Sequence, residues 1–411
     1  MTCSPYFKQR HRVRIFVNQY NLGLRVNNLE KKRSWIHAMR VSISNFRSIE
    51  DLKIELAPLT ILIGPPASGK SNILDAIELA GYLNRFIMLD KEYGNKVNYL
   101  EEPSYILRFS EQKNLFRNED ISRPITISIS NKNLALNIKI FFERGNMYLH
   151  INSKNMYWDF NLRSLSTFFL KDSLINAIGN NFFEARLYAY DRYGLSVQQC
   201  MYSFPCGFHI YLKGSNSRLY PKNVLSELGW NAPVIIKSSP SIVRDINNII
   251  EEYIGKVEVK TLRSGAITIF DHDVEVEANA VSDTILRSLY YLLAIQSTKN
   301  YVKMYGLEKR HILLLEEPES HLFPYFIDLL AQYISEILDI AYVVTTTHNP
   351  LLISMLWDKV RDIKTYYVFR DRRGTTKLKE IDIKRLSSEI VTAEELLHMK
   401  PGEILKKYVR G

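Results

Sequence analysis

The stretch ILIGPPASGKSNILDAI, residues 61–77, constrains the fold more than any other part of the sequence. Gly64, Gly69, Lys70 and Ser71 have the spacing G-x-x-x-x-G-K-[ST] of a phosphate-binding loop. The apolar residues before the loop predict a buried strand, and the apolar periodicity after it predicts a helix. An ordinary strand–turn–helix is the alternative, but the context required by the motif is present on both sides. We therefore predict a loop that binds nucleotide phosphates.

The chemistry of such a loop assigns a task to its backbone and to two of its side chains. The residues predicted to surround the phosphates are Gly64, Pro65, Pro66, Ala67, Ser68, Gly69, Lys70 and Ser71. Backbone N–H groups would cradle the phosphates at the helix N-terminus. Lys70 would reach the β- and γ-phosphates, and Ser71 would hold Mg²⁺. We expect ATP and Mg²⁺ as the bound cofactors.

The composition is that of a globular protein with room for a large core. Of the 411 residues, 46% are hydrophobic and 24% are charged. No apolar run approaches the ~18 residues that a membrane-spanning helix needs, and no secretory signal pattern opens the sequence. The cysteines are Cys3, Cys200 and Cys206, without a C-x-x-C, which argues against disulfide and zinc frameworks. We expect a soluble cytoplasmic protein that does not bind membranes.

The net charge of +10 is concentrated at the two ends of the chain. Residues 1–38 hold eight Lys and Arg against one acid, and residues 358–411 hold fourteen against nine. Basic ends of this kind are either solvated tails or segments that bind nucleic-acid phosphates. The first convincing strand begins near Arg40, so either residues 1–38 form an extension or the true start is Met39.

Strands that alternate with helices predict an α/β protein with a mostly parallel sheet covered on both faces. Residues 40–64 read as a strand, a turn and two more strands, and residues 124–151 alternate with period two, like an antiparallel sheet. Residues 152–235 carry mixed signals. The predicted parts are a basic extension (1–38), a phosphate-loop half with an antiparallel β subdomain (39–150), an inserted α+β lobe (151–280), a second half with the paired acids (281–357) and a C-terminal hairpin and helix (358–411).

Turn and cap residues place several elements in the second half of the chain. Ser239 can cap a helix that has Pro240 at its first position, with Gly255 just past its end. A hairpin is predicted to turn at residues 271–273, and Ser282 can cap the helix that follows. A last hairpin is predicted to turn at residues 372–374, and residues 324–338 form an amphipathic helix.

Two adjacent acids follow a predicted buried strand over residues 312–315. Glu316 and Glu317 would lie at the carboxyl edge of the sheet, where ligands of open α/β sheets bind. One acid could meet Mg²⁺ while the other orients a water toward the γ-phosphate. His348 ends another predicted strand and could face the same phosphate. A solvated acid pair and a structural histidine are the alternatives, and the phosphate loop in the same chain favours the functional interpretation.

Five motifs together identify a family. They are SISNFRS (42–48), the phosphate loop, VSDTILR (281–287), LLLEEPESHLFP (313–324) and TTTHNP (345–350). Their order is that of ATP-binding-cassette-type ATPases, and the chain most resembles the SMC/RecF/OLD-like group of SMC-related AAA ATPases. The order and spacing account for most of residues 40–357. The resemblance implies a P-loop NTPase fold of the ABC/RecF type.

The resemblance also implies a role for each matching residue. The Walker A motif matches Gly64, Gly69, Lys70 and Ser71, and the Walker B metal-side acid matches Glu316. The implied catalytic residues are Glu317 as the base, His348 as the switch histidine and Lys70 on the phosphates. The implied metal ligands are Ser71 and Glu316. Ser282 matches the signature serine, which contacts the nucleotide of a second subunit, and SHLFP resembles the dimer-contacting D-loop.

The sequence departs from the family pattern at several positions. Pro66 and Ala67 stand where many relatives have Asn and Gly, which should stiffen the loop. Thr284 replaces the signature glycine, so the approach to the partner's phosphate should be less close. Glu316 replaces the commoner Asp. The glutamine that usually joins the magnesium shell has only Gln112 as a weak candidate.

Equipment that distinguishes the relatives is missing from this sequence. There are no long heptad arms and no C-x-x-C hook, which argues against an SMC-type tethering machine. The residues after Trp357 are too few for the nuclease domain of OLD-type proteins. We therefore expect the ATPase module without coiled coil or nuclease.

The leading hypothesis is an Mg²⁺-dependent ATPase that forms a head-to-head homodimer around ATP. It would serve DNA repair, genome maintenance or defence, with DNA or a separate nuclease or effector protein as its partner. An alternative is a nucleotide-switched protein-binding module in which hydrolysis is incidental. A phosphotransferase is a further alternative, but no sequence feature indicates an acceptor pocket.

Overall fold

A computed structural model describes most of the chain from Ala38 onward. The described residues are 38–93, 111–132, 135–143, 146–153, 156–161, 184–190, 223–227, 229, 231–263, 266–276, 280–308 and 310–410. The predicted basic extension, apart from Ala38, lies outside these residues, as does much of the segment 152–235 whose signals were mixed.

The main sheet is mostly parallel, as the sequence predicts. Its six strands are β3 (Leu59–Ile63), β8 (Glu184–Tyr188), β12 (His311–Glu316), β13 (Tyr342–Thr346), β14 (Ile363–Arg370) and β15 (Thr376–Glu380). They lie in the order β15-β14-β3-β13-β12-β8, and β15 alone runs antiparallel to its neighbour. Every residue of β3, β8 and β13 is buried, as expected for strands covered on both faces.

The second six-stranded sheet is entirely antiparallel. Its strands are β1 (Met39–Phe46), β2 (Ile49–Leu56), β4 (Ile125–Ser130), β5 (Ala135–Glu143), β6 (Asn146–Ser153) and β7 (Met156–Asn161), in the order β2-β1-β4-β5-β6-β7. Along β4 buried residues alternate with half-buried ones, because one face packs inward and the other meets solvent. The strands predicted over residues 40–64 and 124–151 are thus confirmed.

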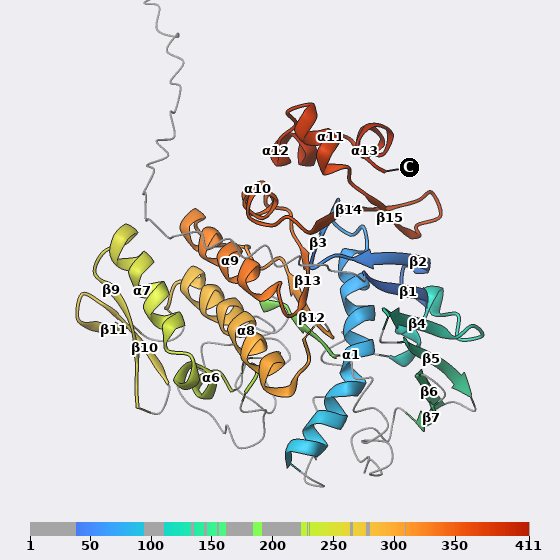
Figure 1. Cartoon of the computed structure of the whole chain (residues 1–411), viewed down its shortest axis with the longest axis horizontal. Coiled ribbons are helices and arrows are strands. Elements are labelled where there is room, and N and C mark those ends of the chain that lie inside the picture. The colour runs from blue at the N-terminus through green and yellow to red at the C-terminus, as the bar shows by residue number, and fades with distance from the viewer. Residues whose placement is uncertain are drawn as a thin grey trace, which may run out of the picture. The chain divides into compact units, whose positions relative to one another are not determined.

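Helices cover both faces of the main sheet (Figure 1). Helix α1 (Lys70–Tyr93) contacts β8, β12 and β13 on one face and also β1 and β4, so it packs between the two large sheets. Helix α8 (Asp283–Tyr305) packs on the opposite face, against β12 and α9 (Pro324–Ile337). Helix α10 (Pro350–Lys359) packs against α9. Among the described residues no helix is both long and apolar enough to cross a bilayer.

A three-stranded sheet lies beside α7 (Ser241–Tyr253) and consists of β9 (Val257–Thr261), β10 (Ile267–Asp271) and β11 (Val274–Val276). The predicted hairpin turn is present, with His272 and Asp273 both at positive φ, as a tight primed turn requires. One prediction is wrong by a residue: Pro240, not Ser239, is the N-cap of α7. Ser239 is instead the C-cap of α6 (Ala232–Ser238), and α7 begins without a side-chain capping hydrogen bond.

Short elements complete the described chain. They are the 3₁₀ helices η1 (Gln112–Leu115) and η2 (Arg117–Glu119) and the C-terminal helices α11 (Ile383–Ser388), α12 (Ala393–His398) and α13 (Pro401–Lys407). The predicted β14–β15 hairpin turns through Gly374, which has a φ of 71°. The helix predicted over residues 324–338 is α9.

Candidate functional site

Three parallel strands bring the candidate site together at one edge of the main sheet. The phosphate loop follows β3, Glu316 ends β12, and His348 lies just after β13, which runs between those two strands. The carboxyl ends of parallel strands are where open α/β sheets bind ligands. The topology therefore explains how residues far apart in the sequence meet.

The two glycines of the phosphate loop are required by close backbone approaches. Gly64 has a φ of 146°, and a Cβ there would lie 2.1 Å from the carbonyl oxygen of Val368. Gly69 has a φ of 101°, and a Cβ there would lie 2.0 Å from the Thr376 hydroxyl. A side chain at Gly64 would displace the backbone of β14, and one at Gly69 would displace the Thr376 side chain.

A chain of hydroxyl groups holds the loop against β15. The Thr376 hydroxyl donates to the Ser68 carbonyl at 3.1 Å and lies 2.7 Å from the Ser48 hydroxyl. Asn72 donates its side-chain N–H to Ser48 at 2.6 Å. Sequence reasoning missed Thr376, because nothing in the sequence signals that a strand more than 300 residues away packs on the loop.

The tip of the loop carries a backbone conformation that usually belongs to glycine. Ala67 is exposed and has a φ of 58°, in the left-handed region. Its neighbour Pro66 is exposed as well. The departure from the family's glycine at position 67 thus stores local strain in the loop.

Lys70 is folded into the loop that precedes it. Its ammonium donates to the carbonyl oxygens of Gly64 at 2.9 Å and Pro65 at 3.1 Å, and the residue is only 6% exposed. Burial lowers the pKa of Lys70 to about 8, although the carboxylates of Glu317 and Glu316 act to raise it. The cation therefore already lies where nucleotide phosphates are expected.

Ser71 and Glu316 form a pair of oxygen ligands. The Ser71 hydroxyl donates to Oε1 of Glu316, and the Glu316 carbonyl accepts from the Tyr291 hydroxyl at 2.8 Å. Mg²⁺ takes oxygen ligands and usually keeps several waters and phosphate oxygens, so two protein oxygens suit it. Within the described part of the chain, no cluster of three or more His, Cys, Asp or Glu offers a separate metal cage. The pair fits Mg²⁺ bound together with a nucleotide.

Glu317 and His348 lie next to each other beside this pair. Nε2 of His348 is 3.5 Å from Oε1 of Glu317, and both side chains are about two-fifths exposed. Partial burial, together with the nearby charge of Lys70, lowers the pKa of His348 to about 4. The ring is therefore neutral at pH 7, and the contact is not an ion pair. Glu317 itself has a φ of 41° and donates its N–H to the Thr346 carbonyl at 3.1 Å.

Among the described residues, no hydrogen bond joins the Ser282 side chain to the phosphate loop of its own chain. Ser282 occupies the N-cap position of α8, as predicted, but its side chain makes no capping hydrogen bond and it is exposed. Thr284 donates its hydroxyl to the His321 carbonyl at 2.7 Å, which ties the start of α8 to the segment after Glu317. Ser282 thus presents an exposed hydroxyl at a helix N-terminus.

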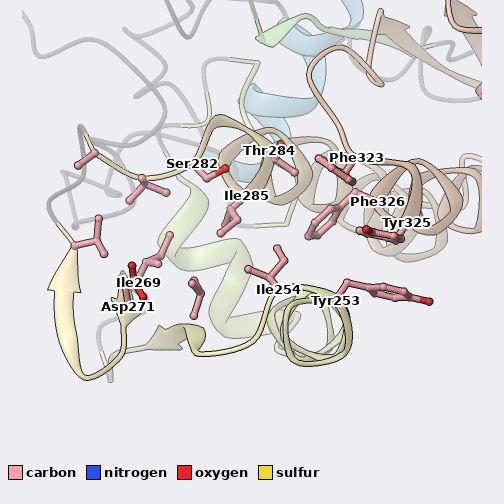
Figure 2. Close-up of a pocket in the computed structure, with 14 residues that line it drawn as sticks. Tyr253, Ile254, Ile269, Asp271, Ser282, Thr284, Ile285, Phe323, Tyr325 and Phe326 are labelled. Carbon is pink, nitrogen blue, oxygen red and sulfur yellow. The ribbon is translucent and has the colours of Figure 1, made fainter. Parts of the chain in front are cut away.

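An apolar groove opens beside Ser282 (Figure 2). Its volume is about 480 Å³, and it is lined by residues from α7, the three-stranded sheet, α8 and the start of α9. The rings of Tyr253 and Tyr325 stack with centroids 3.9 Å apart, and Phe323 stacks on Tyr325 at 5.4 Å. Tyr253 is 49% exposed and Phe323 is 58% exposed. This exposed aromatic row is continuous with the surface that carries Ser282.

Gln112, the weak candidate for the magnesium shell, lies in a short 3₁₀ helix. It is the first residue of η1, and none of the described hydrogen bonds links it to Ser71 or Glu316. Two other residues join the site without having been predicted: Tyr291, which holds the Glu316 carbonyl, and Glu319, which contacts the residues around His348. Glu319 stood inside the recognised motif, but its burial could not be read from the sequence.

Comparison with known proteins agrees with these observations. Residues 39–195 match the model of the AAA ATPase domain family. A 40-residue stretch is 48% identical to the OLD nuclease of Thermus scotoductus and makes up 10% of this chain and 8% of that protein. These similarities support an SMC/RecF/OLD-like ATPase of the ABC type. The chain therefore aligns with less than a tenth of the length of that nuclease.

Solved SMC structures align with most of this chain at low sequence identity. An SMC head bound to the C-terminal winged-helix domain of ScpA is 14% identical, with a TM-score of 0.49, over 85% of this chain and 99% of that chain. The SMC head domain of Thermotoga maritima is 12% identical, with a TM-score of 0.36, over 84% and 99% of the two chains.

Proposed function

We propose that this SMC/RecF/OLD-like ATPase binds ATP with Mg²⁺ and hydrolyses it in a head-to-head homodimer. The observation that carries the proposal is the hydrogen bond between Ser71 and Glu316, with Lys70 on one side and Glu317 and His348 on the other. Cation, oxygen ligands and a candidate base thereby converge where a γ-phosphate would lie. The roles of these residues follow from that arrangement and from the family pattern.

In the proposed reaction, water attacks the γ-phosphorus of ATP and the bond to the bridging oxygen of ADP breaks. Glu317 orients the water and accepts its proton. Lys70 leaves the loop carbonyls and donates to the β- and γ-phosphate oxygens instead. Ser71 and Glu316 would hold Mg²⁺, which would neutralise phosphate charge. The products are ADP and inorganic phosphate.

The proposal includes a second subunit because the Ser282 side chain makes no capping hydrogen bond and is exposed. Its exposed hydroxyl and the N-terminus of α8 suit the γ-phosphate of a nucleotide held by the partner. An isologous dimer would complete two such sites at once. We infer that ATP bound to the phosphate loop of one copy of this chain contacts Ser282 of the other copy and so stabilises the dimer.

The partner and pathway are proposed from the sequence and the family. The OLD nuclease similarity favours defence or genome maintenance, with a separate nuclease or DNA as the partner. The basic residues 1–38 would then bind DNA phosphates, and removal of that segment should weaken DNA binding and its salt dependence. Equal DNA binding by a chain that starts at Met39 would assign the DNA contact to another surface.

The test of the proposed function is the variant Glu317→Gln. Its amide keeps the shape of the carboxylate but loses the proton acceptor, so ATP should still bind while turnover falls at least about 100-fold. The stalled protein should be a dimer with ATP and a monomer without it, as measured by light scattering coupled to size exclusion. Glu308→Gln, an exposed acid before the opposite end of β12, is the matched control. A Glu317→Gln protein that turns over ATP normally, or stays monomeric at saturating ATP, contradicts the proposal.

The groove beside Ser282 favours one second candidate, a nucleotide-switched protein-binding module. In that function ATP would change the accessibility of the aromatic row Tyr253, Tyr325 and Phe323, and hydrolysis would be incidental. Tight ATP binding by the wild-type protein without measurable turnover would support this candidate. Steady turnover that Glu317→Gln stops would exclude it as the main function.

A further inference from the structure

One short segment, Glu317–Phe323, contacts both halves of the candidate site. At its start, Glu317 lies against His348, next to the strand end that carries Glu316. Further along, the His321 carbonyl accepts from Thr284 at the start of α8. Its last residue, Phe323, lines the groove beside Ser282 (Figure 2). The segment therefore joins the phosphate side of the site to the Ser282 side.

Backbone hydrogen bonds fold this segment into turns. The Ser320 N–H donates to the Glu317 carbonyl at 3.1 Å, and the Leu322 N–H donates to the Glu319 carbonyl at 3.0 Å. These bonds form two successive turns. A displacement of His321 or Phe323 must therefore be taken up within a few residues of Glu319.

Glu319 is the buried side chain in the middle of these turns. It is 4% exposed, and its Oε1 accepts from the Thr347 hydroxyl and from the His348 N–H, the latter at 3.4 Å. The Thr347 hydroxyl in turn accepts from the Asn349 N–H at 3.0 Å. One carboxyl oxygen thus fixes residues 347–349, the short loop that contains His348, through direct hydrogen bonds and the Thr347 hydroxyl.

The same hydrogen bonds continue into α10. The side chain of Asn349 caps that helix, and its oxygen accepts from the N–H groups of Leu351 at 2.8 Å and Leu352 at 3.3 Å. The loop with His348 is therefore held at one end by a capped helix and at the other by Glu319. Of these two supports, only Glu319 belongs to the segment that reaches Ser282.

A buried carboxyl is a costly choice for packing alone. Oε2 of Glu319 is buried and accepts no hydrogen bond from any described residue. Burial raises the pKa of Glu319 to about 7, against the hydrogen bonds that lower it. An apolar side chain would fill the same space without an unsatisfied polar atom. We therefore attribute the presence of an acid here to Oε1, which accepts hydrogen bonds from Thr347 and His348.

We propose that Glu319 is a positioning residue that holds His348 for hydrolysis and transmits contacts on the Ser282 side to it. The inference rests on the proposed ATPase function. When a second subunit presses on His321 or Phe323, the turns carry the change to Glu319, and Glu319 moves the loop of His348. Hydrolysis thereby depends on contact between two copies of the chain as well as on bound ATP.

The first test compares Glu319→Ala with Glu319→Gln. Alanine removes the acceptor, whereas the glutamine amide oxygen can still accept from Thr347 and His348. We expect Glu319→Ala to lower kcat about tenfold or more with KM for ATP unchanged, and Glu319→Gln to recover most of the rate. Thr347→Val, which removes the hydroxyl at the other end of the bond, should lower kcat similarly and add little to Glu319→Ala.

Hydrogen exchange measured without ATP gives a second readout that does not depend on activity. Peptides containing His348 and Asn349 should exchange about tenfold faster in Glu319→Ala than in the wild type or in the exposed control Glu308→Ala. Thr284→Val removes the hydroxyl bond to His321 and should speed the same exchange, but not further in the Glu319→Ala background.

The outcomes separate this inference from the proposed function. A folded Glu319→Ala protein with wild-type kcat and unchanged exchange overturns the positioning role. A Glu319→Gln protein as impaired as Glu319→Ala overturns the role of the acceptor oxygen. No effect of Thr284→Val on the exchange overturns the link to the Ser282 side. Absence of ATP turnover in the wild type would instead refute the ATPase proposal, and the exchange measurements would still decide the contacts of Glu319.

Discussion

The phosphate loop and the N-terminus of α8 at Ser282 differ in burial and in the number of hydrogen bonds that fix their side chains. Lys70 and Ser68 of the loop are buried, and the Thr376 hydroxyl holds the Ser68 carbonyl. Ser282 is exposed, and its side chain does not bond to the helix that it begins. The loop is thus preformed, whereas the hydroxyl of Ser282 faces outward.

The reason for the difference lies in what each region packs against. The loop lies between β3 and α1 and is closed from the side by β14 and β15, which leave no room for a side chain at Gly64 or Gly69. The N-terminus of α8 at Ser282 borders an open groove on one side and the turns of Glu317–Phe323 on the other. The preformed phosphate loop could bind a nucleotide in a single subunit. The open surface at Ser282 could be completed by a second subunit.

Replacing Lys70 should have the largest effect on this comparison. Lys70→Ala removes the buried cation. Two charge-assisted hydrogen bonds to the β- and γ-phosphate oxygens, of about 1.5–3 kcal/mol each, would be lost with it. We expect ATP affinity to fall on the order of 100-fold or more, measured by calorimetry on the monomer. Lys303→Ala, an exposed lysine on α8, is the control. Unchanged affinity in Lys70→Ala would show that the loop is not the nucleotide-binding half.

Replacing Ser282 should separate the two regions. In the Glu317→Gln background, Ser282→Arg places bulk and a positive charge on the exposed surface, so the ATP-dependent dimer should disappear. ATP binding to the monomer should stay within about threefold, because among the described residues no hydrogen bond joins the Ser282 side chain to the loop of its own chain. Size exclusion with light scattering measures the first effect, and calorimetry measures the second. Loss of monomer affinity would place Ser282 in the same half as Lys70.

The phosphate side of the site could be predicted from the sequence because its information is local. Gly64 to Ser71 are contiguous, and the buried strands before Glu316 and His348 can be recognised in the sequence as apolar runs. The parallel sheet then brings the three strand ends together by topology alone. The main strands and helices of the second half were predictable for the same reason.

Contacts made by distant side chains could not be predicted. Thr376 meets Ser68 across more than 300 residues, and Glu319 became recognisable only once its burial beneath Thr347 was known. Strand β8 joins the main sheet from a stretch with no clear alternation, because both its faces are covered and no period appears. The one-residue error at Pro240 is of the size that helix ends commonly show.

Glu319 connects the two regions, and its burial predicts a pH dependence of stability. Its pKa is about 7 in the folded chain and 4.5 in an exposed carboxyl, so the unfolded chain loses this proton first. Between pH 4.5 and 7 the wild type should therefore lose about 3 kcal/mol of unfolding free energy relative to Glu319→Gln. Denaturant unfolding of both proteins at several pH values measures the difference. Parallel curves would show that Glu319 is not a buried, protonated acid.

The smallest expected effect concerns the tip of the loop, at Ala67. Its left-handed backbone costs about 1 kcal/mol or more, and Ala67→Gly relieves that cost. The greater freedom of glycine in the unfolded chain offsets about 0.4–1 kcal/mol of the gain, so the net change in stability should be about 1 kcal/mol or less. ATP affinity should change little, because the contacts that hold the loop are made by Ser68 and Lys70 rather than by Ala67. Gly69→Ala is the informative comparison, since its Cβ would overlap the Thr376 hydroxyl and should disrupt the loop. If Ala67→Gly weakened ATP binding as much as Gly69→Ala, the phosphate half would depend on a stiff tip and would be less preformed than its buried contacts indicate.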